Sequence, residues 1–344
     1  MRYLKNAVNL TAQEAEILET GKLEIAQADM MIENVVGTLP IPVGIATSFI
    51  VNGREVLVPM ATEEKLIIRA ASHAAEWTRS TGGFKAHSAG SIMIGQVQVL
   101  KTKNYGWAKR RVLAHRREIL ALANTQSSTR KAVDLRVKEW ESPRMLVVEL
   151  LVDVKDSMGA NVVDSMCEAV TPLIESLTGG KANLRIVSNL ATERMARVDV
   201  TVKKHAVGGD ETVKRMLSVC AFAEEDPYRA ATHNKEILDG VSAVLLATSN
   251  DFRAVAAGAH AFAALSGRYR PLSSWTENEN GDLQGRLEMP MAVGTVGGSV
   301  SSHPTAGICM KILGVKKAAE LGEIAASVGL ACNLSALSSF ANRC

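Results

Sequence analysis

The sequence predicts an α+β protein in which a mainly helical large domain is interrupted by an inserted module of strands and helices. Strands and helices follow in the order βαββαββ over about 100 residues from near Ser91, which indicates a compact α+β module. From Asp210 onward the chain is rich in alanine and mainly helical, broken by a Gly-, Asn- and Trp-containing segment at 273–300. We therefore expect a large domain built from both ends of the chain.

The N-terminal part predicts a capped helix, a hairpin and a second helix. LTAQEAEIL begins a helix, because Thr11 can cap it and Glu14 completes a capping box. MIENVVGTLPIPVGIATSFIVNGREVLVPM has β-rich runs around an Asn52-Gly53 turn, which favours strands and a hairpin. A helical pattern follows from Thr62 to Thr78 and ends at Gly82-Gly83.

The inserted module carries the clearest alternation of strand and helix patterns. We expect strands at IMIGQVQVL, 134–140, 144–154, LRIVSNL and ARVDVTVKK, and helices at 109–124 and 161–177.

Composition excludes several classes of protein. With 47% hydrophobic but only 4% aromatic residues, the core must be aliphatic. A net charge of +3, from 39 basic and 36 acidic residues, gives no overall field that would recruit nucleic acid or a membrane. Five cysteines without a CxxC pair fit free thiols in a reducing compartment. Without a secretory signal, and with apolar runs such as VSAVLLAT that are short of a membrane span, we expect a cytoplasmic globular protein.

Lys235 and Asp251 lie at the margins of the apolar stretch 231–254. A lysine at such a boundary is usually a surface residue whose methylenes cover apolar groups, and Asp251 could simply cap a helix. One continuous helix would put the two on nearly opposite faces, so their meeting requires a break at Asp239-Gly240 or Ser249-Asn250.

Glu63-Glu64 lie where a predicted strand gives way to a helix. Acidic residues are common in the first helical turn, where the macrodipole stabilises them. If a partner surface covered a carboxyl there, burial would favour its protonated form, and the carboxyl could then donate a proton.

Two glycine-containing loops, 156–166 and 291–304, could receive phosphates. Neither is a G-x-G-x-x-G turn in a βαβ unit, so a Rossmann domain is not indicated. The seven histidines are not spaced as metal ligands, and we predict no metal site.

Taken together, many of these segments resemble the class II branch of the 3-hydroxy-3-methylglutaryl-CoA (HMG-CoA) reductase family. The matching stretches run in family order from about residue 20 to 337. They are MIENVVGTLPIPVGIA, NGREVLVPMATEE, GGFKA, MIGQVQV, VDVKDSMGANVVDSMCEAV, LRIVSNLA, DPYRAATHNK, ATSNDFRAVAAGAHAFA, LEMPMAVGTVGG and ILGVKKAAELGEIAASVGLACN.

The resemblance implies a two-step, NAD(P)H-dependent reduction of HMG-CoA to mevalonate and CoA, or the reverse. Lys235 matches the family's catalytic lysine and would stabilise the alkoxide formed at the thioester carbonyl. Asp251 matches its aspartate and would sit between the lysine and the glutamate, coupling their titrations. Glu64 matches that glutamate and would protonate the mevaldehyde carbonyl oxygen.

The resemblance also implies the domains and the binding residues. Residues 1–91 and 189–344 would form the large HMG-CoA domain, and 92–188 a small ferredoxin-like, non-Rossmann, NAD(P)-binding domain. Arg229, as partner of the substrate carboxylate, and Asn234 would bind substrate. The dinucleotide would contact Asp156, Met158, Gly159, Asn161 and Asn189.

A position after LAN bears on the choice of cofactor. NAD-preferring members can carry an aspartate there, which would repel a 2′-phosphate; this chain has Ser127, followed by Arg130 and Lys131. A hydroxyl beside cations accepts a phosphate, so we expect NADPH rather than NADH. Members of the family are homodimers with interfacial active sites and with the segment Glu33 to Gly37 nearby, and we expect the same here.

Four departures from the family pattern leave an alternative open. Leu66 stands where a serine contacts the HMG group, Asp239 where asparagine is frequent, and Ser249 where glycine is usual. The sequence ends at LSSFANRC, before the C-terminal flap whose histidine protonates the CoA thiolate in the family, so we expect that flap to be absent from this chain. The alternative is an impaired paralogue that binds HMG-CoA or CoA esters without full turnover.

Overall fold

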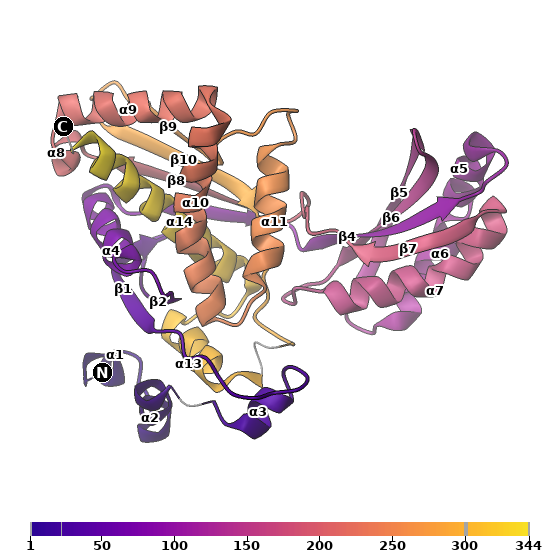
Figure 1. Cartoon of the computed structure of the whole chain (residues 1–344), viewed down its shortest axis with the longest axis horizontal. Coiled ribbons are helices and arrows are strands. Elements are labelled where there is room, and N and C mark those ends of the chain that lie inside the picture. The colour runs from indigo at the N-terminus through magenta and orange to yellow at the C-terminus, as the bar shows by residue number, and fades with distance from the viewer. Residues whose placement is uncertain (1, 22, 299–301, 343–344) are drawn as a thin grey trace. The chain divides into compact units, whose positions relative to one another are not determined.

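The computed structural model describes residues 2–21, 23–298 and 302–342. Two compact units make up the chain: a large unit of residues 1–88 and 196–344, and a small unit of residues 89–195 (Figure 1). Both contain helices and strands, so the predicted mixed α/β class is confirmed.

The small unit is an antiparallel four-stranded sheet with helices packed against it (Figure 1). The strand order is β5-β6-β4-β7, which places the first strand of the unit next to the third and the fourth. A Cβ on Gly95 would lie 2.5 Å from Cys167 Sγ and 2.6 Å from Val163 Cγ1, so this glycine allows α7 to approach the sheet closely. In chain order the elements are β4 (Ile92–Leu100), α5 (Tyr105–Ala114), α6 (Arg116–Ala123), a 3₁₀ helix (Asn124–Gln126), β5 (Lys131–Glu141), β6 (Arg144–Asp153), α7 (Ala160–Thr178) and β7 (Lys181–Val187).

The large unit begins with the capped helix and the hairpin that the sequence predicted. Glu14 N donates to Thr11 Oγ1 at 3.2 Å and Thr11 N to Glu14 Oε2 at 2.7 Å, which forms the capping box of α2. Val51 pairs with Arg54 across the Asn52-Gly53 turn. These first elements are α1 (Arg2–Ala7), α2 (Ala12–Thr20), α3 (Ile25–Asp29), β1 (Val43–Val51), β2 (Arg54–Ala61), α4 (Ile67–Thr78) and a 3₁₀ helix (Arg79–Thr81).

A second four-stranded sheet, of order β3-β8-β10-β9, forms the other β layer. It comprises β3 (Lys85–Ala89), β8 (Met195–Val202), β9 (Ser273–Glu277) and β10 (Leu283–Pro290). The sequence indicated only a break in a mainly helical region at 273–300, but this segment contains the strands β9 and β10. Gly285 pairs with Trp275 and has the indole ring directly over it, a cross-strand contact that a local pattern does not reveal.

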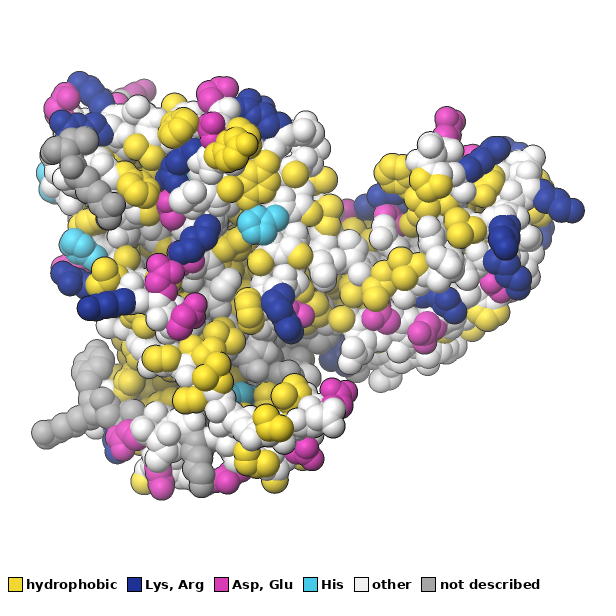
Figure 2. Space-filling model, viewed as in Figure 1, with side chains coloured by type: hydrophobic (Ala, Val, Ile, Leu, Met, Phe, Trp, Pro, Cys, Tyr) yellow, Lys and Arg dark blue, Asp and Glu magenta, His cyan; other side chains and the backbone are white. Residues whose placement is uncertain are grey.

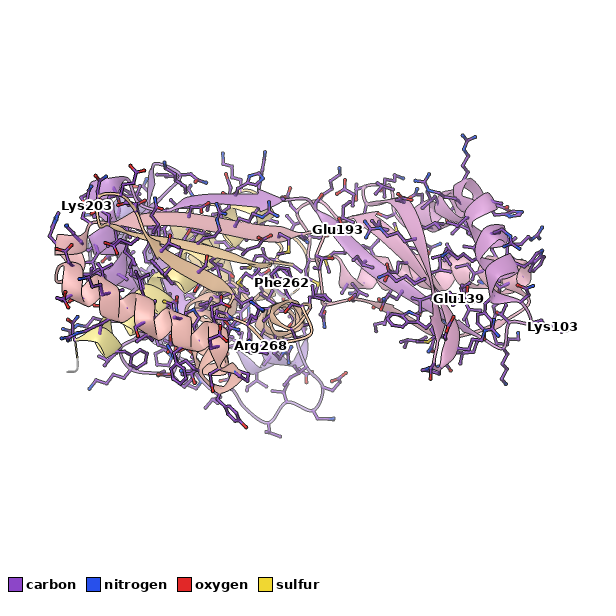
Figure 3. The ribbon with its side chains drawn as sticks, turned by 90° about the horizontal axis from the view of Figure 1, so that it is seen from above. Lys103, Glu139, Glu193, Lys203, Phe262 and Arg268 are labelled. Atoms are coloured by element: carbon purple, nitrogen blue, oxygen red, sulfur yellow. The ribbon has the colours of Figure 1, made fainter. Side chains whose placement is uncertain are left out.

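The remaining helices build the core and hold the sheet. α8 (Lys204–Val207) and α9 (Asp210–Glu225) follow β8, and α11 (Phe252–Ala263) and α13 (Pro304–Leu313) flank the strands β9 and β10 in sequence. Lys203 donates to Asp282 at 2.8 Å, and Arg268 donates to Glu224 O at 2.9 Å; both basic residues are labelled in Figure 3. These bonds fasten β8 and the segment after α11 to their neighbours.

Helices α10 (Pro227–Ala247) and α14 (Ala318–Ala341) cross at two glycines. A Cβ on Gly240 would lie 2.8 Å from Val328 O, and one on Gly329 2.7 Å from Val241 Cγ2. Any side chain at either position would separate the helices, so these glycines fix the position of α10 on α14.

Among the described residues one helix, α14, is long and apolar enough to cross a membrane, whereas the sequence reading found no run of that length. In the structure, 78% of its most apolar window is buried inside the protein. It belongs to the main hydrophobic cluster of the large unit, so its apolar side chains are already covered by protein contacts.

Candidate active site

The structure brings Lys235 and Glu64 together from distant parts of the chain. Lys235 lies on α10, and its Nζ donates to Glu64 Oε2 at 3.0 Å. Glu64 is in the turn between β2 and α4, where its backbone N–H donates to Thr62 Oγ1 at 3.1 Å. Two residues predicted to act together therefore meet within this chain.

A second carboxylate, Asp239, contacts the same ammonium. Its Oδ2 lies 2.7 Å from Lys235 Nζ, one helical turn further along α10. The hydrogen bond that Lys235 donates to Asp239, aided by the one it donates to Glu64, raises the pKa of Lys235 above its ordinary value. Burial raises the pKa of Asp239, although Lys235 partly offsets this.

These charges open onto a cavity of about 470 Å³ in the large unit. Its polar lining includes Glu63, Glu64, Lys235, Asp239 and His260, and its apolar lining includes Ile41, Ile67, Leu238, Leu246 and Phe252. Apolar walls lower the local dielectric, which strengthens the interaction of a substrate with the lysine. The arrangement suits a reaction in which negative charge develops on an oxygen next to an ammonium.

Asp251 is not between the lysine and the glutamate, contrary to the prediction. It caps α11, accepting a hydrogen bond from Ala254 N at 3.0 Å, and lies 3.5 Å from Arg253 Nε. Within the described parts of the chain its carboxylate makes no hydrogen bond or ion pair with Lys235 or Glu64. The reason is that α10 runs unbroken through Asp239-Gly240 to Ala247, so the chain turns only at Ser249, which has φ +54°.

Leu66, the first departure from the family pattern, stands at the N-cap of α4 in a left-handed conformation with φ +83°. Its side chain is exposed and cannot cap the helix, so the α4 N-terminus lacks a side-chain hydrogen bond. A branched residue at positive φ is strained, by about 1–2 kcal/mol. This strain lies two residues from Glu64, in the turn that positions its carboxylate.

Arg229 is held by an internal carboxylate. Its Nη1 donates to Glu236 Oε1 at 3.0 Å and its Nη2 to Glu236 Oε2 at 3.4 Å, and both side chains are only 11% exposed. A substrate carboxylate would have to displace Glu236, so the predicted substrate contact is not preformed. The structure favours a structural role for Arg229.

Asn234 is also engaged within the protein, which corrects its assignment as a substrate ligand. It is fully buried; its Nδ2 donates to Arg270 O at 2.9 Å, and Leu272 N donates to its Oδ1 at 2.8 Å. Its amide therefore joins α10 to the start of β9 and has no surface to offer a ligand.

A buried polar network on the inner side of α10 was not predicted from the sequence. His233 is paired through Nε2 with Ser273 Oγ at 2.7 Å; Ser273 donates to Asn333 Oδ1 at 2.8 Å, and Asn333 donates to Glu236 at 3.3 Å. Burial lowers the pKa of His233 to about 3, so the imidazole is neutral. The only available signal was the polar run THNKE within an otherwise apolar helix.

In the small unit, the predicted dinucleotide residues cluster at the N-terminus of α7. Gly159 is its N-cap with φ +96°, and a Cβ there would collide with Val154. Among the described residues, no side chain caps this helix and no acid lies in its first turn, which leaves its first N–H groups suited to an anion. Met158 and Asn161 flank Gly159, with Asn161 exposed to solvent.

Arg194 fastens this loop to the segment that follows β7. The buried guanidinium donates to Ser157 O at 2.9 Å and to Met158 O at 3.4 Å. Burial lowers the pKa of Arg194 to about 10, against the opposing effects of Asp156 and Asp153. Arg194 thus holds the loop that contains Asp156 next to the turn that contains Asn189, a positioning role that the sequence did not suggest.

Ser127 organises a tight turn. Its Oγ accepts hydrogen bonds from Thr129 N at 3.3 Å and Arg130 N at 3.0 Å, and Lys131 Nζ donates to its carbonyl at 3.2 Å. The ammonium of Lys131 therefore lies beside Ser127, whereas Arg130 contacts Ser127 through its backbone N–H and directs its guanidinium to Thr129 Oγ1 at 3.2 Å.

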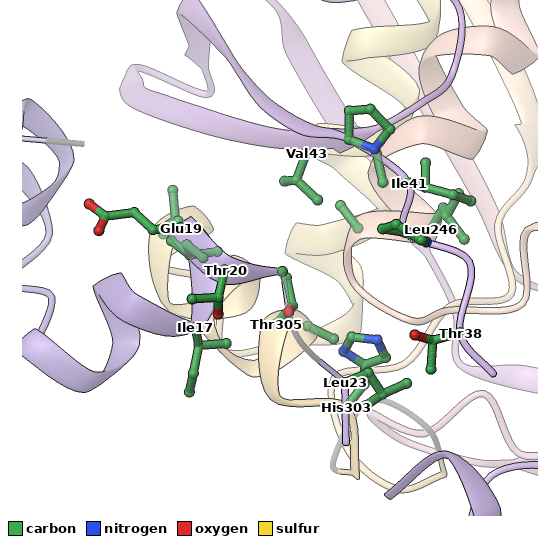
Figure 4. Close-up of a pocket in the computed structure, with 18 of the residues that line it drawn as sticks. Ile17, Glu19, Thr20, Leu23, Thr38, Ile41, Val43, Leu246, His303 and Thr305 are labelled. Carbon is green, nitrogen blue, oxygen red and sulfur yellow. The ribbon is translucent and has the colours of Figure 1, made fainter. Parts of the chain in front are cut away.

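A second, mainly apolar cavity of about 550 Å³ lies in the large unit (Figure 4). Ile17, Leu23, Ile41, Leu246 and His303 are among its lining residues, and Ile41 and Leu246 also line the cavity around Lys235. In the described residues, no group of three or more His, Cys, Asp or Glu is arranged to hold a metal ion.

Comparisons with known proteins agree with one another. A family model described as hydroxymethylglutaryl-coenzyme A reductase matches residues 1–343. A 3-hydroxy-3-methylglutaryl-coenzyme A reductase of Archaeoglobus fulgidus is 47% identical over 339 residues, which are 96% of this chain and 78% of that protein. A probable enzyme of the same name from Borreliella burgdorferi is 32% identical over 324 residues, 90% of this chain and 73% of that protein. Among solved structures, the class II reductase of Streptococcus pneumoniae bound to NADPH in open conformations is similar at a TM-score of 0.95 and 37% identity, covering 98% of this chain and 85% of that one.

Proposed function

This chain belongs to the hydroxymethylglutaryl-coenzyme A reductase family, and we propose that it interconverts HMG-CoA and mevalonate plus CoA with NADPH. The reduction of HMG-CoA consumes two hydrides and two protons and releases CoA as the thiol. The observation that carries the proposal is the contact of Lys235 with Glu64 beside a cavity, in a chain 47% identical to a named reductase.

The large unit would bind HMG-CoA and supply the charged groups. Lys235 would stabilise the negative charge that develops on the thioester oxygen, and later on the aldehyde oxygen. Glu64, in hydrogen-bond contact with that lysine, would donate the proton that converts mevaldehyde to the alcohol. Asp251 would act from its cap position at the start of α11, next to Phe252, which lines the cavity.

The small unit would bind NADPH, which when bound supplies the hydrides. The side-chain-free cradle at Gly159 and the uncapped α7 N-terminus suit a pyrophosphate, with Asp156, Met158, Asn161 and Asn189 around it. The Ser127 turn, with Arg130 and Lys131, suits a 2′-phosphate. The residues present therefore fit this cofactor.

The assembly we propose is a cytoplasmic homodimer. Its support is the exposed apolar segment around 25–43, in which Met30, Ile32, Val36 and Leu39 are all solvent-exposed. Hydrophobic side chains also gather on the surface of the large unit in Figure 2. Contiguous apolar surface of this kind marks an interface, and a second copy of the chain is its proposed partner.

The deciding experiment follows NADPH oxidation with HMG-CoA and, separately, with mevaldehyde. We expect oxidation with both substrates, and mevalonate as the product. Oxidation with mevaldehyde alone would restrict the proposal to the second reduction step. Tight binding of HMG-CoA without oxidation by either substrate would contradict the proposal and support a non-catalytic CoA-ester binder.

A further inference from the structure

Two carboxylates, those of Asp239 and Glu64, contact the ammonium of Lys235, and they differ in distance and in exposure to solvent. Asp239 is nearer, at 2.7 Å against 3.0 Å for Glu64, and its side chain is 22% exposed against 53% for Glu64. The nearer partner is thus also the better sheltered one, and its contact is screened less by water.

The backbone that carries Asp239 is fixed by packing. The next residue, Gly240, lies against Val328 O and Cys332 Sγ of α14, each 2.8 Å from where its Cβ would be. Glu64, in contrast, belongs to a turn that precedes the strained Leu66. Asp239 therefore contacts Lys235 from a helix that is fixed by packing, whereas Glu64 contacts it from a turn.

The proposed chemistry makes this difference matter. To donate a proton, Glu64 must first hold one, and a neutral carboxyl no longer forms an ion pair with Lys235. A lysine without a charged anchor recovers the rotational freedom of its long side chain. A second carboxylate on the same ammonium would keep it in place while Glu64 carries the proton.

We propose that Asp239 is the positioning residue that holds the Lys235 ammonium in the cavity while Glu64 is protonated. The inference rests on the proposed reductase function. Asp239 acts through the lysine and is not itself a proton donor to substrate.

Several titratable and charged groups surround Asp239. Glu63, Glu64 and Lys235 face it from the cavity, with His260 also in the lining, while Glu236 on α10 and Cys332 on α14 lie close on the inner side. The Asp239 and Glu64 carboxylates are within about 6 Å of each other, since both contact one nitrogen. Burial raises the pKa of Asp239, the nearby charges of Glu64 and Glu63 add to that rise, and the contact with Lys235 opposes it.

Two substitutions of Asp239 distinguish the effect of its hydrogen bond with Lys235 from the effect of its negative charge. Asp239→Asn keeps an oxygen that can accept from Lys235 but removes the charge, and Asp239→Ala removes both. For Asp239→Asn we expect the alkaline limb of the pH–kcat profile with mevaldehyde to move about 0.5–1 unit to lower pH, with KM little changed. For Asp239→Ala we expect kcat to fall about tenfold or more, with Asp239→Asn retaining the larger share. Glu211→Gln removes one exposed carboxylate on α9 and should leave the profile as it is.

A second readout does not need turnover. The rate at which an amine-directed acylating reagent modifies Lys235, followed against pH by peptide mass spectrometry, should rise at lower pH in Asp239→Asn than in the wild type. An unchanged acylation profile together with an unchanged pH–kcat profile would overturn the inference while leaving the reductase intact. A wild-type protein that oxidises NADPH with neither substrate would instead defeat the proposed function, and the acylation profile would still decide whether Asp239 anchors the lysine.

Discussion

Arg229 and Glu236, two turns apart on α10, form a buried ion pair in which both guanidinium nitrogens meet the carboxylate, at 3.0 and 3.4 Å. Glu236 also accepts a hydrogen bond from Asn333 of α14. The pair thus joins the helix that bears Lys235 to the central helix of the core.

Removing Arg229 should destabilise the folded protein. In Arg229→Ala the buried Glu236 carboxylate loses its counter-charge, and we expect a loss of about 3–5 kcal/mol in the free energy of unfolding by urea. Arg286→Ala, which breaks an exposed pair with Asp199, should cost less than about 1 kcal/mol. Glu236→Gln should leave the KM for HMG-CoA within about twofold; a much lower KM would mean that freed Arg229 binds the substrate carboxylate.

Lys235→Met should remove the cation that stabilises the developing oxyanion. We expect kcat with HMG-CoA to fall by about 10²–10³-fold while the protein stays folded, as judged by circular dichroism. Lys214→Met, which removes a lysine paired with Glu211 on the surface of α9, serves as the matched control. Equal kcat in the two variants would exclude the proposed role of Lys235.

Asp251 can be tested apart from its cap. Serine caps a helix about as well as aspartate, so Asp251→Ser should change the apparent Tm by no more than about 2 °C. Because serine has no charge, kcat should nonetheless fall by about 10²-fold. Full activity of Asp251→Ser would reduce this residue to a helix cap, and Asp251→Ala would then differ from it only in stability.

The choice of cofactor should depend on the Ser127 turn. An aspartate can accept the same two backbone N–H groups, so Ser127→Asp should preserve the turn while placing a negative charge where a 2′-phosphate would bind. We expect the ratio of kcat/KM for NADPH to that for NADH to fall about tenfold or more. Ser176→Asp, at the far end of α7, should leave the ratio unchanged.

His233 should make the protein sensitive to acid. Its pKa is 6.5 in the ordinary state and about 3 when buried, so below pH 6.5 the unfolded chain takes up a proton that the folded one does not. The free energy of unfolding should therefore decrease as the pH is lowered. This residue should contribute a decrease of about 1.4 kcal/mol per pH unit between pH 6.5 and about pH 3. The slope of unfolding free energy against pH should be smaller in His233→Gln than in the wild type, and His205→Gln, at an exposed position on α8, should not change it. Equal slopes in all three proteins would argue against a neutral buried imidazole.

Local chemistry in the sequence was enough for several elements. The capping box at Thr11 and the hairpin turn at Asn52-Gly53 depend only on neighbouring residues, and both were predicted correctly. Glu64 and Lys235 could be paired in advance only through the family resemblance, because they are 171 positions apart in the sequence and nothing between them encodes the contact locally.

The failures arose where tertiary contacts decide. Asp239-Gly240 looked like a possible helix break, but its glycine is required for contact with α14 and α10 continues through it. For the same reason Asp239, and not Asp251, became the second carboxylate on Lys235. The helix expected at 109–124 is divided at His115 into α5 and α6, and β9 and β10 depend on the Trp275–Gly285 contact.

The glycine crossing of α10 and α14 has a consequence for anyone who would engineer this protein. Replacing a helical glycine with alanine is an ordinary route to a sturdier helix, worth about 1 kcal/mol. At position 240 or 329 the added methyl would act as a wedge, tilting α10 and carrying its lysine away from the opposing loop. The placement of Lys235 opposite Glu64 thus depends on two glycines, Gly240 and Gly329, that take no part in the reaction.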